Sequence, residues 1–263
     1  MTDNEQESMI EIIDLYKKFD GHQVLDGVNL KIKTGETTVI IGRSGCGKSV
    51  LLKHIIGLLK PDSGHILIDG KDVTKMDEKE LNVLRMQFGM LFQGAALFDS
   101  LNILENVGFG MIEHTKSNNE AIRKRVKECL ELVGLRSIEH KKPAELSGGM
   151  RKRVGLARAI ALRPHIILYD EPTTGVDPIM GDSVNDLILE LHNKLNVTGI
   201  AVTHDMTSAY KIADRIAMLY NGKIIAQGSP DDIKNTTDPV VKQFITGASK
   251  GPITEGIDFK HLI

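Results

Sequence analysis

The chain has 263 residues, of which 41% are hydrophobic and 26% are charged, so it can bury a full core. Its net charge of −2 does not favour nucleic acid or an acidic lipid surface as the main partner. No apolar run approaches the roughly 20 residues that span a bilayer. The acidic, polar start MTDNEQES is unlike a signal peptide, and two cysteines make a structural disulfide unexpected. We therefore expect a cytoplasmic protein with one large domain, or a domain with an inserted lobe.

Two strands are expected near the start of the chain, at residues 10–15 and 28–33, and the second alternates apolar and polar side chains. Tyr16 and Phe19 lie between them. An aromatic ring at this place can stack on an adenine base, or it can belong to the core.

The pattern G-x-x-x-x-G-K-S occupies residues 42–49 (GRSGCGKS). It follows a β-branched run, TTVII, that predicts a buried strand at 37–41, and it precedes an apolar helical pattern at 50–58. Glycines let backbone amides approach a triphosphate, and the free amides at a helix start point at the same anion. Each hydrogen bond to a charged group contributes about 1.5–3 kcal/mol, so these donors decide the affinity.

This motif predicts an ATP site. Lys48 would reach the β- and γ-phosphates, and the Ser49 hydroxyl would bind Mg²⁺. The other nucleotide-binding residues of the motif are Gly42, Arg43, Ser44, Gly45, Cys46 and Gly47.

Further strands are predicted at 65–68 and 86–92, and the first of them ends in the hairpin signal Asp69-Gly70. Gln93 follows the second strand. A glutamine at a strand end beside a phosphate site can bind Mg²⁺ and sense the γ-phosphate, or it can serve as a capping amide.

Residues from about 104 to 162 are predicted to be mostly helical, which makes this block a candidate inserted lobe. Within it, Ser147 is a good N-cap for a basic helix, and the amides of Gly148 and Gly149 can meet an anion. The charges at 151–153 (RKR) are typical of a solvated helix face rather than a nucleic-acid patch.

A buried strand at 165–169 ends in Asp170 and Glu171, the acidic pair that a phosphate-binding loop requires. Asp170 would hold Mg²⁺ through water, and Glu171 would polarise the attacking water. A turn then starts a long helix at 179–195. His204 follows another buried strand, at 198–203, where it is placed to meet the γ-phosphate.

Strands at 215–220 and 223–226 flank Asn221-Gly222, a strong hairpin signal, and a helical stretch to about residue 244 follows. The tail from 247 finishes with Phe259, Leu262 and Ile263. This tail either docks on a partner or second subunit, or forms a frayed terminus.

Taken together, these motifs resemble the nucleotide-binding subunit of the ABC ATPase family over residues 9–246. In that family GRSGCGKS is the Walker A motif, Gln93 the Q-loop, LSGGM the signature, IILYDE Walker B, TGVD the D-loop and His204 the switch histidine. The resemblance implies an α/β P-loop core with a mostly parallel sheet, an N-terminal antiparallel β-subdomain and a helical lobe at about 94–163. Residues 247–263 extend beyond this domain.

The resemblance also implies a head-to-tail dimer around two ATPs. Each ATP would be held by Walker A of one subunit and by the signature of the other. It places Phe19 rather than Tyr16 on the adenine. The implied catalytic residues are Glu171, His204, Gln93 and Lys48, and the implied metal ligands are Ser49, Gln93 and Asp170. Ser147 and Gly149 would contact the ATP across the dimer, and Gly148 and Asp177 are further implied ATP-binding residues. Met150 stands where most of the family has Gln, but because Ser147 and Gly149 are kept, activity should survive.

Three segments, ELSGGMRKRVGLARAI, FQGAALFDSLNILENV and DEPTTGVDP, are similar to ATPases that work with MCE-type lipid-binding proteins, the MlaF-like phospholipid-trafficking subfamily. This implies a multi-spanning MlaE-like permease, an MlaD-like MCE protein and an MlaB-like STAS subunit as partners, with no nucleic acid. It implies a peripheral location on the cytoplasmic face of the inner membrane.

A non-transport ABC ATPase of the iron–sulfur assembly type is the alternative, although its members do not usually show the GAALFDSL segment. DNA-repair and ribosome-binding members usually carry tandem nucleotide domains or long coiled-coil insertions, which this sequence does not show.

Overall fold

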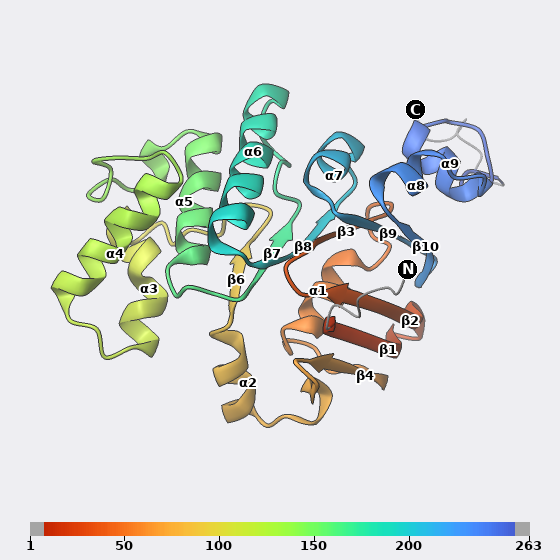
Figure 1. Ribbon diagram of the computed structural model, residues 1–263, viewed down its shortest axis with the longest axis horizontal. Helices are drawn as coiled ribbons and strands as arrows, with labels where there is room; N and C mark the ends of the chain where they lie inside the picture. Colours follow the sequence, from red (N-terminus) through yellow and green to blue (C-terminus); the bar gives the residue numbers. More distant parts are fainter. Residues whose placement is uncertain (1–7, 256–263) are drawn as a thin grey trace, which may run out of the picture.

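The computed structural model of this chain describes residues 8–255. Its centre is a six-stranded sheet of order β10-β9-β3-β8-β7-β6, parallel except for β10 (Figure 1). The strands are β3 (Thr37–Ile41), β6 (Phe88–Leu91), β7 (Ile166–Asp170), β8 (Thr198–Thr203), β9 (Arg215–Tyr220) and β10 (Lys223–Gly228). The runs TTVII and TGIAVT are buried throughout, as expected for parallel strands covered on both faces.

Helices cover the two faces of this sheet. On one face α1 (Lys48–Ile55) packs through Leu51 and Leu52 against Ile40 and Ile200. The other face carries α6 (Pro178–Leu195) and α7 (Met206–Ile212), which lie above the sheet in Figure 1. The carboxyl ends of β3, β7 and β8 therefore meet at one edge, between these layers.

A second, antiparallel sheet of order β2-β1-β4-β5 lies on the far side of α1. It contains β1 (Ser8–Phe19), β2 (His22–Lys33), β4 (Ser63–Ile68) and β5 (Lys71–Asp72). The expected gap between the first two strands is wrong, because Asp20 and Gly21, both at positive φ, join them as a two-residue hairpin. Tyr16 and Phe19 therefore belong to β1.

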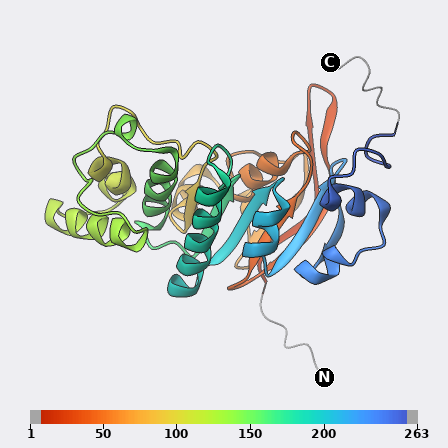
Figure 2. The ribbon, with the colours of Figure 1, turned by 90° about the horizontal axis from the view of Figure 1, so that it is seen from above.

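The predicted helical lobe is formed by α3 (Ile103–His114), α4 (Asn119–Leu132) and α5 (Gly148–Ile160), at one end of the molecule (Figure 2). The three helices begin at the side-chain caps Asn102, Asn118 and Ser147. Their apolar faces meet in a core that includes Val107, Val126 and Val154.

Two short helices of the structure were not predicted from the sequence. Before β6, α2 (Glu78–Arg85) was not expected; Asp77 and Glu80 start it with a reciprocal capping box. Because Met86 still belongs to the end of α2, β6 begins at residue 88 rather than 86. The helix α7 was also missed, although Asp205 caps it through Thr207 N and Ser208 N.

The single helical stretch predicted after β10 is two helices, α8 (Pro230–Lys234) and α9 (Pro239–Thr246). Each starts with a capping side chain followed by proline, which cannot continue a preceding helix. Past α9, Gln243 donates from Nε2 to Ala248 O and Thr254 Oγ1 and accepts from Ile253 N, so the chain turns back onto this helix. Phe259, Leu262 and Ile263 lie outside the described residues.

Candidate active site

The phosphate-binding loop joins β3 to α1 in a conformation that requires glycine at two places. Gly42 and Gly47 have φ of 155° and 105°. A Cβ on Gly42 would lie 2.4 Å from Leu219 O, and one on Gly47 would lie 3.0 Å from Val24 Cγ1. The backbone is therefore packed closely against β9 and β2, and it leaves an amide-rich turn at the start of α1.

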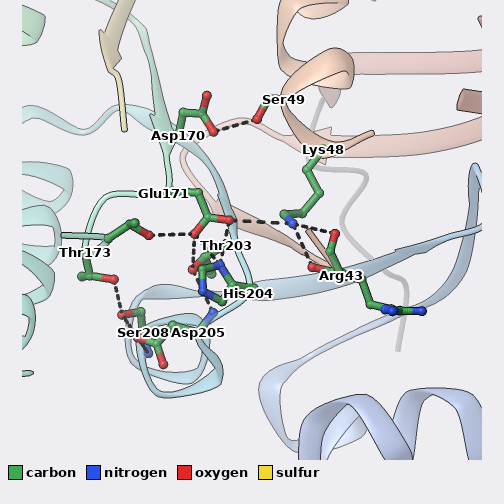
Figure 3. Close-up of polar contacts among 12 residues, drawn as sticks. Arg43, Lys48, Ser49, Asp170, Glu171, Thr173, Thr203, His204, Asp205 and Ser208 are labelled. Atoms are coloured by element: carbon green, nitrogen blue, oxygen red, sulfur yellow. Dashed lines mark hydrogen bonds and ion pairs between the residues drawn. The ribbon is translucent and has the colours of Figure 1, made fainter. Parts of the chain in front are cut away.

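Lys48 is the first residue of α1 and is only 6% exposed. Its Nζ donates to Gly42 O at 2.8 Å and to Arg43 O at 3.1 Å, so the ammonium is held over the loop (Figure 3). The same Nζ lies 3.7 Å from Glu171 Oε1. Lys48 thus connects the loop to the acidic pair at the end of β7.

Ser49 and Asp170 meet across the sheet edge. The Ser49 hydroxyl donates to Asp170 Oδ1 at 3.0 Å (Figure 3). A hydroxyl oxygen and a carboxylate at this spacing are hard oxygen donors of the kind that Mg²⁺ prefers. Two of the three predicted metal ligands, Ser49 and Asp170, are therefore neighbours. The third, Gln93, is exposed and follows the end of β6 by two residues.

Glu171 follows β7 with a φ of 48°, a left-handed conformation that is unusual for a non-glycine residue. Its backbone amide donates to Val202 O at 2.9 Å, which fixes this turn to β8. Its carboxylate accepts hydrogen bonds from Thr203 Oγ1 and Thr174 Oγ1, both at 3.3 Å. The side chain is therefore oriented from two sides.

The half-exposed His204 lies directly after β8, with Nδ1 3.0 Å from Glu171 Oε1 (Figure 3). Facing a carboxylate, this nitrogen is the one that carries the proton. The structure thus brings together Lys48, Ser49, Asp170, Glu171 and His204, which the sequence places in three separate segments.

Ser147, Gly148 and Gly149 form a second group, at the start of α5. The Ser147 hydroxyl accepts from Met150 N at 3.3 Å, so the predicted N-cap is confirmed. Asp177 caps α6 by accepting from Ile179 N and Met180 N. The two helix starts touch, because a Cβ on Gly149 would lie 2.5 Å from Met180 Cε.

Phe19 lies at the end of β1, is 40% exposed, and has Lys17 Nζ 5.3 Å from its ring centroid. The Tyr16 ring instead packs over Gly27, so that its hydroxyl would be 2.8 Å from a Cβ there. The two aromatic candidates are almost equally exposed, at 38% for Tyr16 and 40% for Phe19, so exposure does not separate them.

The interpretation of residues 151–153 as a solvated face is wrong for two of them. Lys152 is 4% exposed and donates from Nζ to Gln93 O and, at 3.3 Å, to Glu171 O. Arg153 donates to Val133 O at 2.8 Å and Ser183 Oγ at 2.7 Å. A signal was available, since Lys152 shares one helical face with the buried Gly149 and Gly155 at i−3 and i+3.

The fold and this site are those of a P-loop ATPase. The dimeric structure of MJ0796, a bacterial ABC transporter cassette, superimposes with a TM-score of 0.78 at 36% identity, covering 84% of this chain and 99% of the other. The structure of cbiO1 from Clostridium perfringens, part of the ABC transporter complex cbiONQ, gives a TM-score of 0.80 at 33% identity over 87% of this chain and 91% of its own. The predicted fold class is thereby confirmed.

The ABC transporter family profile matches residues 25–174, and the chain belongs to this family. It is 42% identical to the intermembrane phospholipid transport system ATP-binding protein MlaF of Haemophilus influenzae, over 94% of each chain. It is 44% identical to the probable ribonucleotide transport ATP-binding protein mkl of Mycobacterium leprae, over 93% of this chain and 70% of the relative. The predicted family resemblance is confirmed.

Proposed function

We propose that this chain is the ATP-hydrolysing subunit of an ABC transporter that powers phospholipid trafficking across the cell envelope. The observation that carries the proposal is the 42% identity to MlaF of Haemophilus influenzae, in an alignment that covers 94% of this chain and 94% of the relative. The 41% identity to MlaF of Escherichia coli over 88% of this chain supports the same assignment.

ATP is proposed to bind on the loop at residues 42–49. The close packing at Gly42 and Gly47 supports this, because it leaves backbone amides rather than side chains facing the anion. Lys48, already over the loop, would move its ammonium to the β- and γ-phosphates. Phe19 is proposed to stack on the adenine, since its exposed ring lies on the hairpin whose Val24 contacts Gly47.

Mg²⁺ is proposed to bind at Ser49, Asp170 and Gln93. The oxygen pair of Ser49 and Asp170 fits this ion, and the ion would supply positive charge at the transferred phosphate. Glu171 is proposed as the general base for the attacking water. Thr203 and Thr174 orient its carboxylate, and His204 places a proton-bearing nitrogen beside it.

The second ATP contact is proposed to come from another copy of the chain. Ser147, Gly148, Gly149 and Asp177 lie together at the starts of α5 and α6, where free helix amides face outward. The solved relative MJ0796 is dimeric, and one of its structures is a post-hydrolysis state bound to ADP and Pi. A head-to-tail dimer would bring this group onto the partner's γ-phosphate.

A groove of about 370 Å³ between the core and the helical lobe is proposed to receive a cytoplasmic segment of a multi-spanning, MlaE-like permease. Its apolar lining includes Met86, Phe92 and Phe109. Phe92 directly precedes Gln93, so a segment seated here would contact the residue that senses the γ-phosphate. An apolar groove rimmed by polar groups suits the apolar face of a helix.

The other partners are proposed to be an MlaD-like MCE protein and an MlaB-like STAS subunit, which would place the chain peripherally on the cytoplasmic face of the inner membrane. Within residues 8–255, no helix is long and apolar enough to cross a membrane. The ATPase domain is proposed to span residues 1–246, with the helical lobe at about 94–163.

A pull-down of tagged protein from its own membranes in gentle detergent tests the proposal. Proteins and lipids are identified by mass spectrometry. We expect a permease, an MCE-domain protein and bound phospholipid to co-purify. Recovery of soluble iron–sulfur assembly proteins without a membrane-embedded partner would overturn the transporter while leaving the ATPase. Recovery of a permease with ribonucleotide but no phospholipid would overturn the lipid assignment.

A further inference from the structure

Two lysines are buried within residues 8–255, and both contact segments of the candidate active site. One is Lys48 of the phosphate-binding loop; the other is Lys152, in the middle of α5. A buried ammonium is costly unless polar groups satisfy it. The groups that satisfy Lys152 are the main-chain carbonyls of Gln93 and Glu171.

These two carbonyls belong to residues that follow the ends of two adjacent strands. Gln93 follows β6 and Glu171 follows β7, and the two strands pair in parallel from Phe88 with Ile166 to Leu91 with Tyr169. One ammonium therefore fixes the spacing of the two chain segments that carry the proposed phosphate sensor and the proposed general base.

A second cation of α5 holds the continuation of the same loop. The Arg158 guanidinium donates to Ala95 O and Ala96 O, both at 2.6 Å. Ala95 and Ala96 have φ of 62° and 47°, a left-handed conformation that is uncommon for residues other than glycine. The loop after Gln93 is thus held by α5 in a conformation that it would not favour alone.

The backbones of α5 and β6 are in direct contact. A Cβ on Gly89 of β6 would lie 2.4 Å from Ala159 O, and one on Gly155 of α5 would lie 2.8 Å from Leu91 Cδ1. Because the two elements are packed this closely, α5 cannot move without displacing the end of β6.

The pKa of Lys152 is lowered overall, because burial outweighs the charges of the neighbouring carboxylates. Burial lowers the pKa of Lys152, and the nearby Asp170 and Glu171 raise it.

We propose that Lys152 is a positioning residue for ATP hydrolysis, which ties the Gln93 and Glu171 segments to α5. This rests on the proposed function of those two residues. Ser147, proposed to contact the ATP of the partner subunit, caps the same helix five residues earlier, about 7.5 Å along its axis. Lys152 therefore links the ATP site of its own subunit to the signature serine that serves the other site.

The test compares the full chain with Lys152→Met, which keeps the length of the side chain and removes the charge and donors. We expect kcat for Mg-ATP to fall roughly 10- to 100-fold, as for a displaced catalytic group. Binding of a fluorescent ADP should change less than about twofold, because the phosphate-binding loop is untouched, and the Hill coefficient for ATP should fall toward one. Lys152→Arg should restore part of kcat, because it keeps the cation.

Lys127→Met, an exposed lysine on α4 of the same lobe, is the matched control and should leave kcat and the Hill coefficient unchanged. Should Lys152→Met not fold, Lys152→Gln takes its place with the same expected loss. Native kcat and Hill coefficient in the folded variant, with Glu171→Gln inactive, would overturn the positioning role and leave the proposed function standing. Native turnover in Glu171→Gln would instead overturn the catalytic assignment on which the inference rests.

Discussion

At the residue scale, the centre of the site is a strained backbone held by its neighbours. Glu171 at a φ of 48° is fixed by the hydrogen bond from its backbone amide to Val202 O. Its carboxylate forms hydrogen bonds with the side chains of Thr174, Thr203 and His204. Strain of this kind persists only where the surroundings over-determine it, and it concentrates at functional sites. The exact orientation of the carboxylate therefore depends on β8 as much as on β7.

Asp72 provides a residue-scale prediction away from the site. Burial by itself raises the pKa of Asp72, but hydrogen bonds from Thr74, Lys75 and His65 outweigh it and hold the pKa at about 2. Because the folded pKa lies below the unfolded one, Asp72 stabilises the fold above about pH 4, and this stabilisation disappears as the pH falls toward 2.

Asp72→Asn should therefore lower the free energy of unfolding by roughly 2 kcal/mol near neutral pH, and the difference from the native chain should shrink below about pH 4. Urea unfolding at a series of pH values measures this. Asp69→Asn, in the exposed turn before β5, is the control with little effect. A difference that stays constant down to about pH 2 would show that the carboxylate charge is not the cause.

At the element scale, the contact between β6 and α5 holds the helical lobe on the core. Gly89→Ala should be destabilising, because the new methyl group would meet the backbone carbonyl of Ala159, which cannot move independently of its helix. The expected loss in the free energy of unfolding is about 1–3 kcal/mol, typical of overpacking. Thermal unfolding measures it, with Gly94→Ala, where the added Cβ meets nothing within 4 Å, as the control. Equal melting temperatures for the two variants would contradict the tight contact.

Much of the fold was predictable at this scale. The bounds expected for β3, β8 and β9 agree with the structure, because uninterrupted β-branched and apolar runs ended by polar residues define buried strands. The short helices α2 and α7 were missed, since each is eight residues or fewer and depends on its cap rather than on a long apolar period.

The residues of the candidate site that belong to sequence motifs were predictable, whereas a residue that joins the site because it is buried was not. The sequence placed Lys48 and Ser49 in the phosphate-binding motif and placed Asp170, Glu171 and His204 at strand ends, and the structure brings them together. It did not indicate the role of Lys152, because a charged residue was assigned to the surface by its type rather than by its place in the helical period. The left-handed backbone at Ala95, Ala96 and Glu171 also has no sequence signal, since none of them is glycine.

At the scale of the whole molecule, the central sheet separates two apolar cores. One core joins the antiparallel sheet to α1, and the other joins the sheet to the helical lobe and α6. At the carboxyl ends of β3, β7 and β8, the side chains of Lys48 and Ser49 from α1 meet those of Asp170, Glu171 and His204. In the proposed dimer, the lobe would extend from this edge and complete the site of the partner, so ATP would be bound by two copies.

The most direct test of this account is the Glu171→Gln variant of the full chain with Mg-ATP, in which turnover and molecular mass are measured together. The amide keeps the shape of the side chain but cannot accept the proton of water. The account predicts no turnover and an ATP-dependent dimer of twice the 29.0 kDa chain, which ADP does not produce. Turnover at the native rate, or a monomer that persists at saturating ATP, would contradict it.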